Sequence, residues 1–190
     1  MMISVIIPTL NESSTIARTL TRTVALGFDD IIVSDGGSSD PTRQMVQACC
    51  ARVPAVRLVT APTGRARQLN EGVKACRGDV LLFLHADTEL PPTARTAIES
   101  ALEQASYVGG RFDVRFDQPS RWGAVISWFM NRRSRLTGIA TGDQAIFVRR
   151  RVFEQMGGFP DMPLMEDIEF SRRLKRRGPT AALTDRVTTS

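Results

Sequence analysis

The chain has 190 residues, a net charge of +5 and an apolar fraction of 42%. This length and composition indicate one folded domain and argue against a disordered chain. No apolar run is long enough to span a bilayer, and the chain opens into a predicted strand rather than a signal peptide, so we expect a cytoplasmic protein. The excess positive charge suits a nucleic acid, an anionic membrane surface or a phosphate-rich ligand. Since no nucleic-acid-binding module accompanies it, we do not expect a nucleic acid partner.

Strands and helices alternate through the first half of the chain. Strands are predicted at residues 3–9, 30–35, 56–60 and 79–85, and helices at 12–26, 41–52, 65–77 and 92–104. This order predicts an α/β fold with a mostly parallel sheet and right-handed crossovers. Residues 1–105 therefore form the first half of a single predicted domain that covers residues 1–190.

The pattern changes after residue 105. A half-exposed strand is predicted at 108–116, a helix at 120–136, a strand at 144–148 and a helix at 165–177. Residues 106–190 form a second, smaller half. The chain stops after residues 187–190 without a predicted element, which leaves a truncated C-terminus open.

Two predicted strands end in a carboxylate that is followed by turn residues. Residues 5–12 read Val-Ile-Ile-Pro-Thr-Leu-Asn-Glu, and residues 31–36 read Ile-Ile-Val-Ser-Asp-Gly. Ligands of open parallel sheets bind beyond the carboxyl ends of the strands, so we expect Glu12 and Asp35 at one pocket. Ionised carboxylates only accept hydrogen bonds, which suits a ligand with N–H and O–H donors such as a nucleobase and a ribose.

Charged residues also follow the third and fourth predicted strands. Arg65 and Arg67 open a helix, where they suit an anionic phosphate, although arginines that simply face water explain them equally well. His85 and Asp87 follow the apolar residues 81–84 and share one face of the strand. Asp87 suits Mg²⁺ or Mn²⁺. For His85, the only histidine, a structural hydrogen bond is the favoured interpretation, with metal ligation as the alternative.

Two further acidic segments lie in the second half. Glu166 and Asp167 begin a predicted helix, where acids complement the helix dipole, and one of them could instead act as a general base. Asp143 and Gln144 belong to a glycine-containing loop that reaches an acceptor hydroxyl or forms an ordinary tight turn.

The predicted helix at 120–136 carries Trp122, Trp128, Phe129 and several arginines. Such a helix can lie at a membrane interface. The pattern alone favours a helix that packs its aromatic residues on the core and exposes its arginines.

Taken together, these motifs resemble family 2 inverting glycosyltransferases of the GT-A fold, most closely a bacterial subgroup with His-Ala-Asp at the metal motif. The resemblance covers nearly the whole chain, and its motifs keep the family's order at residues 5–12, 33–40, 64–70, 85–87 and 165–167. It implies a Rossmann-like, mostly parallel central sheet flanked by helices. Residues 1–105 would then bind a nucleotide-sugar, and residues 106–190 would form a smaller antiparallel portion on the acceptor side.

The resemblance implies a nucleotide role for six positions of the first half. Pro8, Thr9 and Glu12 match residues that hold the nucleoside of a UDP- or GDP-sugar. Asp35 matches a carboxylate that accepts from the base. Arg67 and Asn70 match positions near the base and the diphosphate, beside Arg65.

The resemblance also implies which residues bind the metal ion and which residue acts as the general base. Asp87 matches the last residue of the Asp-X-Asp motif that anchors Mn²⁺ or Mg²⁺, Asp167 the general base, and Glu166 its partner. His85 stands where the family usually has Asp, so the metal would depend more on the diphosphate for its ligands. The acceptor is unknown; a lipid or lipid-linked molecule would place the protein peripherally at the inner face of the membrane.

Other classes fit less well. A nucleotidyltransferase needs a glycine-rich loop with a lysine near the first strand, which residues 8–12 do not supply. An NAD-linked enzyme needs G-x-G-x-x-G after a strand, and residues 36–39 lack that spacing. A non-catalytic protein that binds a nucleotide-sugar remains open.

Overall fold

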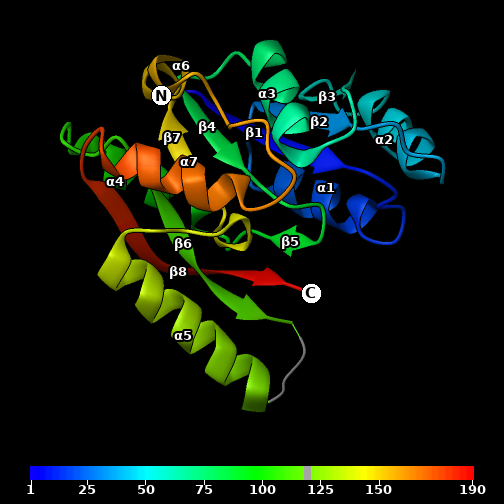
Figure 1. Ribbon diagram of the computed structural model, residues 1–190. Helices are drawn as coiled ribbons and strands as arrows, with labels where there is room; N and C mark the ends of the chain where they lie inside the picture. The colour runs from blue at the N-terminus through cyan, green and yellow to red at the C-terminus, as the bar shows by residue number, and fades with distance from the viewer. Residues whose placement is uncertain (118–120) are drawn as a thin grey trace.

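The computed structural model describes residues 1–117 and 121–190, with the side chain of residue 121 left out. Its described strands form one mixed sheet in the order β3-β2-β1-β4-β7-β6-β8-β5, and helices cover both faces (Figure 1). The first half supplies the parallel strands, at Ile3–Thr9 (β1), Asp30–Asp35 (β2), Val56–Thr60 (β3) and Val80–Phe83 (β4). The helices between and after them are Ile16–Ala25 (α1), Thr42–Cys50 (α2), Arg65–Ala75 (α3) and Ala94–Glu103 (α4).

The second half extends the same sheet. Its strands are Gly109–Phe116 (β6), Phe147–Arg149 (β7) and Thr180–Thr189 (β8). The short strand Thr88–Glu89 (β5) of the first half pairs with β8 at the edge of the sheet. The helices of the second half are Arg121–Thr137 (α5), Arg150–Met156 (α6), Glu166–Lys175 (α7) and the short 3₁₀ turn Gly142–Gln144 (η1). β7 runs antiparallel to β4 and β6, whereas β8 runs parallel to β6.

Alternate residues of the buried strands face two separate apolar layers. Val5 and Ile7 of β1 pack with Ile16 of α1 and Ile98 of α4. Ile6, between them, faces the other side of the sheet with residues of α3, α6 and α7. This alternation follows from the two-residue period of a strand. It fixes the sheet as a middle layer, so the carboxyl ends of β1, β2 and β4 open at one edge.

Two predictions for the second half are wrong, and one helix was not predicted. The strand expected at 144–148 begins only at Phe147, because Gln144 lies in η1 and Ala145 takes a left-handed backbone with φ of 45°. Helix α6 was not predicted; it begins at Arg150, directly after the last residue of β7. Residues 187–189, expected to lack an element, belong to β8, which is held between β6 and β5.

The aromatic residues of α5 also contradict the expectation of a core-facing helix. Trp122 is 78% exposed, Trp128 55% and Phe129 60%. The buried positions of this helix are instead Ser127 and Ser134. Within the described residues, no helix has both the length and the apolar character needed to cross a bilayer.

Candidate functional site

A cavity of about 420 Å³ opens at the carboxyl ends of β1 and β4, beside the first turn of α3. We call it the strand-end cavity. It brings together six of the predicted site residues: Pro8, Thr9, Glu12, Arg65, His85 and Asp87. Because α3 begins at Arg65, the unpaired N–H groups of its first turn lie beside this cavity, a position that suits an anion.

Asp35 lies at the end of β2 beneath the cavity lining rather than in it. Its buried carboxylate accepts hydrogen bonds from the backbone N–H groups of Gly37 and Ser38, both at 3.0 Å, and pairs with Arg43 at 3.2 Å. Burial alone would raise the pKa of Asp35, but the hydrogen bonds from Ser38 and Gly37 and the Arg43 charge outweigh it and lower the pKa. The ionised carboxylate therefore shapes the loop after β2.

Arg67 and Asn70 lie outside the cavity lining as well. The Arg67 Nε lies 3.0 Å from both carboxylate oxygens of Asp161. The Asn70 amide donates to the carbonyl oxygen of Phe159 and accepts from its N–H, both at 2.9 Å. Both side chains thus connect α3 to the segment that leads into α7.

Sequence reasoning missed Gln68, which lies within the first turns of α3. Its buried Nε2 donates to the carbonyl oxygens of Thr9 at 2.6 Å and Ser34 at 3.2 Å. The amide therefore holds the ends of β1 and β2 against α3. A Cβ at Gly36 would lie 2.8 Å from this amide, so a glycine is needed there. The sequence signal, a glutamine between the core residues of an amphipathic helix, is too common to be specific.

A second, narrow pocket adjoins the strand-end cavity. Arg65 and His85 line both, and the second pocket adds Gly142, Glu166 and Asp167. We call it the η1–α7 pocket. Residues that are far apart in the sequence, on α3, β4, η1 and α7, thus border one continuous region.

Asp167 is held by backbone donors at the start of α7. Its Oδ2 accepts from the N–H of Gly142 at 2.6 Å, and its Oδ1 accepts from the N–H of Ile168 at 2.7 Å. These bonds fix the carboxylate while leaving lone pairs for a further donor. A half-buried carboxylate held in this way suits proton abstraction.

Glu166 is 4% exposed and lies 3.4 Å, Oε1 to Nε, from Arg65. Its Oε1 accepts no hydrogen bond from any residue that the structure describes. A buried carboxylate oxygen without a hydrogen bond is costly, so this atom is an available acceptor for a ligand donor.

His85 forms the wall between the two pockets. Its Nδ1 lies 3.1 Å from Asp143 Oδ1, and the Arg65 guanidinium lies against its ring nitrogens. The hydrogen bond from His85 is the largest cause that lowers the pKa of Asp143. A Cβ at Gly142 would lie 2.3 Å from His85 Nε2, so a glycine permits this close approach.

Gln144 points away from both pockets. It is fully buried, its Nε2 donates to the carbonyl oxygen of Phe112 at 3.3 Å, and its Oε1 accepts from the N–H of Thr141 at 3.3 Å. Of the two predicted acceptor residues, Asp143 contacts His85 at the wall between the two pockets without lining either, and Gln144 supports the η1 loop from behind.

Backbone strain gathers next to the predicted site residues. Among the described residues, the non-glycine positions with positive φ are Asn11, Ala145 and Met165, at 59°, 45° and 64°. They adjoin Glu12, Gln144 and Glu166 respectively. Such conformations cost about 1–2 kcal/mol for an ordinary residue and cluster at functional sites.

The donor atoms at Asp87 fit a divalent ion bound mainly through a substrate. Asp87 Oδ2 accepts from the hydroxyl of Ser190 at 2.7 Å. No group of three or more His, Cys, Asp or Glu side chains is arranged as a metal cage in the part of the chain that the structure describes. Mg²⁺ and Mn²⁺ sites of the phosphate-binding kind use one or two carboxylates and take further ligands from phosphates and water.

Comparison with known sequences gives the family. The model of glycosyl transferase family 2 matches residues 4–157. The undecaprenyl-phosphate 4-deoxy-4-formamido-L-arabinose transferase of Edwardsiella ictaluri is 32% identical over 143 residues, which cover 70% of this chain and 41% of the relative. The probable glycosyltransferase YdaM of Bacillus subtilis is 29% identical over 209 residues, which cover 93% and 47%. The chain thus spans less than half the length of these curated relatives.

Solved structures share the fold. TarS of S. aureus superposes with a TM-score of 0.82 at 17% identity, covering 100% of this chain and 37% of that one. The mannosyltransferase PcManGT from Pyrobaculum calidifontis, solved with GDP-Man and Mn²⁺, superposes with a TM-score of 0.73 at 22% identity, covering 98% and 56%. These superpositions confirm the predicted α/β fold of the GT-A type. Because the family model extends from β1 through α6, this chain belongs to glycosyl transferase family 2.

Proposed function

We propose that this protein transfers a sugar from a UDP- or GDP-sugar to an acceptor hydroxyl, with inversion at the anomeric carbon. The observation that carries the proposal is that the strand-end cavity and the η1–α7 pocket share Arg65 and His85 as a common wall. A donor in the first pocket and a base in the second would face the same reacting carbon.

The donor would lie across the carboxyl ends of β1, β2 and β4. Pro8, Thr9 and Glu12 would contact the nucleoside, and Arg65 with the N-terminus of α3 would bind the diphosphate. The proposed nucleotide-binding set also includes Asp35, Arg67 and Asn70. Their hydrogen bonds support an indirect role, in which they hold the loops that the nucleotide touches.

Asp87 would hold Mn²⁺ or Mg²⁺ together with oxygens of the diphosphate. When bound, the ion would neutralise charge on the departing nucleoside diphosphate. Arg65, which also lines the cavity, would share that task. The contacts of His85 favour a structural role over metal ligation, because Asp143 engages Nδ1 and the Arg65 guanidinium lies against Nε2.

Asp167 would accept the proton of the attacking hydroxyl. The backbone N–H of Gly142 orients its carboxylate, and Glu166 would hold the sugar or the acceptor through Oε1, which faces Arg65 but accepts no hydrogen bond from a described residue. The hydroxyl oxygen would form its bond to the anomeric carbon as the bond to the diphosphate breaks. A single displacement of this kind inverts the centre and needs no covalent sugar–protein intermediate.

The acceptor would approach from the side of η1, where Asp143 contacts His85 and Gln144 supports the loop. We propose a lipid or lipid-linked acceptor and a peripheral position on the inner face of the membrane. The names of several curated relatives, which are undecaprenyl-phosphate sugar transferases, support this acceptor class.

A thermal-shift panel of UDP-, GDP- and dTDP-sugars, with and without Mn²⁺, tests the donor. A ligand at 100 times its Kd stabilises a fold by about 2.7 kcal/mol, which for this size raises Tm by roughly 5–10 °C. We expect such a shift for one nucleotide class, larger with Mn²⁺, and release of the free nucleoside diphosphate on incubation. Binding without release across a broad acceptor panel would favour a non-catalytic sensor, and no shift from any sugar nucleotide would contradict the proposal.

A further inference from the structure

Helix α5 exposes an apolar face, whereas an ordinary surface helix buries its apolar face. Its outward face carries Trp122, Ile126, Phe129 and Leu136, each at least half exposed. The spacing of these residues, four, three and seven, makes one stripe along a helix. A helix of a soluble protein normally turns such a stripe toward the core. In α5 the stripe faces outward, so it does not pack within the described fold.

Polar contacts hold the inward face of α5 on the sheet. The Asn131 amide donates to the carbonyl oxygen of Val114 at 2.9 Å and accepts from its N–H at 2.8 Å. The buried Arg111 donates through its Nε to the hydroxyl of Ser134, which is fully buried. The orientation of α5 is thus fixed by hydrogen bonds, and the aromatic stripe is left facing outward.

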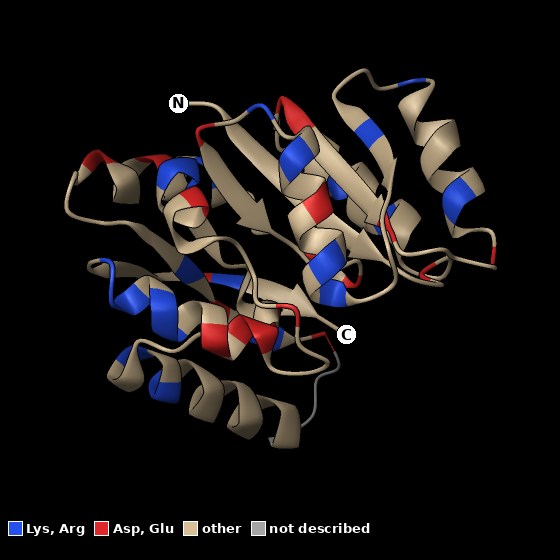
Figure 2. Ribbon diagram, turned by 45° about the horizontal axis from the view of Figure 1, so that its top comes forward, with Lys and Arg blue, Asp and Glu red and all other residues tan. Residues whose placement is uncertain are grey.

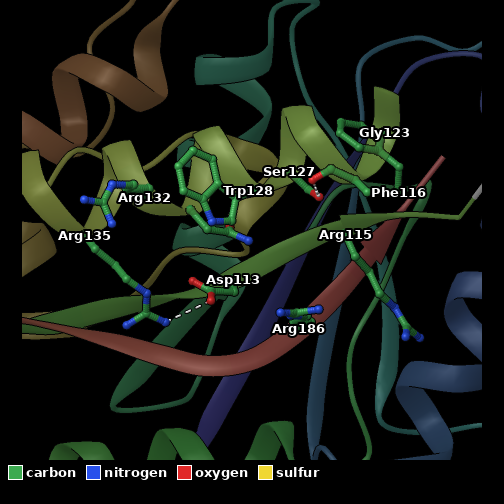
Figure 3. A pocket seen from close by; sticks show the side chains of 11 residues that line it. Asp113, Arg115, Phe116, Gly123, Ser127, Trp128, Arg132, Arg135 and Arg186 are labelled. Atoms are coloured by element: carbon green, nitrogen blue, oxygen red, sulfur yellow. Dashed lines mark hydrogen bonds and ion pairs between the residues drawn. The ribbon is translucent and has the colours of Figure 1, made fainter. Parts of the chain in front are cut away.

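A basic groove of about 460 Å³ runs between α5 and the strands β6 and β8 (Figure 3). Its charged lining consists of Arg115, Arg132, Arg135, Arg186 and Asp113. Asp113 pairs with Arg135 at 2.9 Å. The remaining three arginines form no ion pair with any described residue, so the groove has an excess of three positive charges.

The basic and aromatic features belong to one surface. Trp128 lines the groove, and the Arg132 guanidinium lies over its ring, 5.6 Å from the centroid. Arg132, Arg133 and Arg135 lie toward the C-terminal end of α5 (Figure 2), and the helix contains no acid. Tryptophan at the headgroup level, beside arginines and an apolar stripe, is the composition of a helix that lies in a membrane interface.

This surface adjoins the acceptor side of the site. Asn131, which anchors α5, lies 3.5 Å from Gln144 Nε2, and Gln144 directly follows Asp143 in η1. Binding of α5 to an external surface would therefore also bring the η1 loop close to that surface.

We propose that α5 docks this protein on an anionic lipid surface, with the stripe of Trp122, Ile126, Phe129 and Leu136 in the interfacial layer and the groove arginines on lipid phosphates. Charge complementarity favours an anionic lipid surface over an uncharged apolar partner. Such a partner would leave Arg115, Arg132 and Arg186, which form no ion pair within the described part of the chain, without counterions. The inference does not require sugar transfer, so the two proposals can fail separately.

The chain contains its own probe for this contact. Its only two tryptophans, Trp122 and Trp128, both lie on α5, so intrinsic fluorescence reports on this helix alone. With phosphatidylglycerol-containing vesicles at low salt, we expect a blue-shifted emission and quenching by brominated lipid. Both effects should weaken as salt is added and with pure phosphatidylcholine vesicles.

Two double variants distinguish an effect of the groove arginines from an effect of the protein's total charge. Arg132→Gln with Arg186→Gln should weaken partitioning by about 10-fold or more, because each arginine near an anionic leaflet contributes about 1 kcal/mol. Arg151→Gln with Arg176→Gln removes the same charge from exposed positions outside the groove and should leave partitioning unchanged. Circular dichroism confirms that each variant is folded.

Three outcomes would overturn the proposal. The first is no vesicle binding at low salt. The second is binding without a change in tryptophan emission, which would place the contact on another surface. The third is an emission that is already blue-shifted without lipid in a dimer identified by light scattering, which would assign the stripe to a second copy of the chain.

Discussion

Asp167→Asn is expected to lower turnover by about 10²–10⁴-fold, the usual contribution of a positioned general base. The amide keeps the shape of the side chain, and its oxygen can still accept from the N–H of Gly142. It cannot take a proton from an acceptor hydroxyl. The affinity for the nucleotide should stay nearly unchanged, because Asp167 lines the η1–α7 pocket and not the strand-end cavity. Single-turnover rates and calorimetric titration measure the two quantities separately.

Glu169→Gln is the matched control for this variant. Glu169 also lies in the first turn of α7, but its nearest cation is Arg172 at 3.8 Å on the surface. The control removes the same charge from the same helix and should leave turnover unchanged. Equal losses of turnover and nucleotide affinity in Asp167→Asn, or a large drop in its Tm, would show that Asp167 is structural.

Asp87→Asn is expected to reduce kcat/KM by at least about 10²-fold and to remove most of the Mn²⁺ dependence of nucleotide binding. Charge stabilisation by a metal is worth several kcal/mol, and each 1.4 kcal/mol is about tenfold in rate. Asp87 is the predicted anchor whose carboxylate lies in the strand-end cavity. The direct readout is the thermal shift of the variant with UDP or GDP, measured with and without Mn²⁺.

Asp29→Asn provides the comparison for Asp87→Asn. Asp29 is exposed, pairs with Arg95 at 3.3 Å and precedes β2, at the opposite edge of the sheet from the cavity. This variant should keep the full difference between shifts with and without Mn²⁺. If Asp87→Asn also keeps that difference, the ion is held elsewhere and the proposed role of Asp87 is wrong.

The strands β1, β2 and β4 were predictable because they are buried on both faces of the sheet. Residues 30–35 are all buried, so the apolar residues 31–33 indicate the strand, and Gly36, directly after Asp35, indicates its end. β8 gave no such signal. Its threonines and charged residues alternate with few apolar ones, and its place depends on pairing with β6 and β5. Strands that are stabilised by their neighbours rather than by their own composition are not visible in a single sequence.

The site residues also differ in whether their positions could be inferred from the sequence. Glu12, Asp87 and Asp167 follow or begin regular elements, so their convergence could be inferred from strand order and motif order. Gln68 and Gly142 could not be inferred, because their roles depend on the close approach of α3 to β1 and of η1 to His85. The outward turn of α5 was also hidden, since the hydrogen bonds of Asn131 fix the face that a hydrophobic pattern would have reversed.

The imidazole signal of His85 tests the central claim most directly. His85 is the only histidine in the chain, and it lines both the strand-end cavity and the η1–α7 pocket, so one NMR resonance reports from their shared wall. If a nucleoside diphosphate binds there, UDP or GDP with Mg²⁺ should move this resonance, and the corresponding nucleoside alone should move it much less. A folded protein whose His85 signal is unchanged by millimolar UDP, GDP and dTDP would contradict the account.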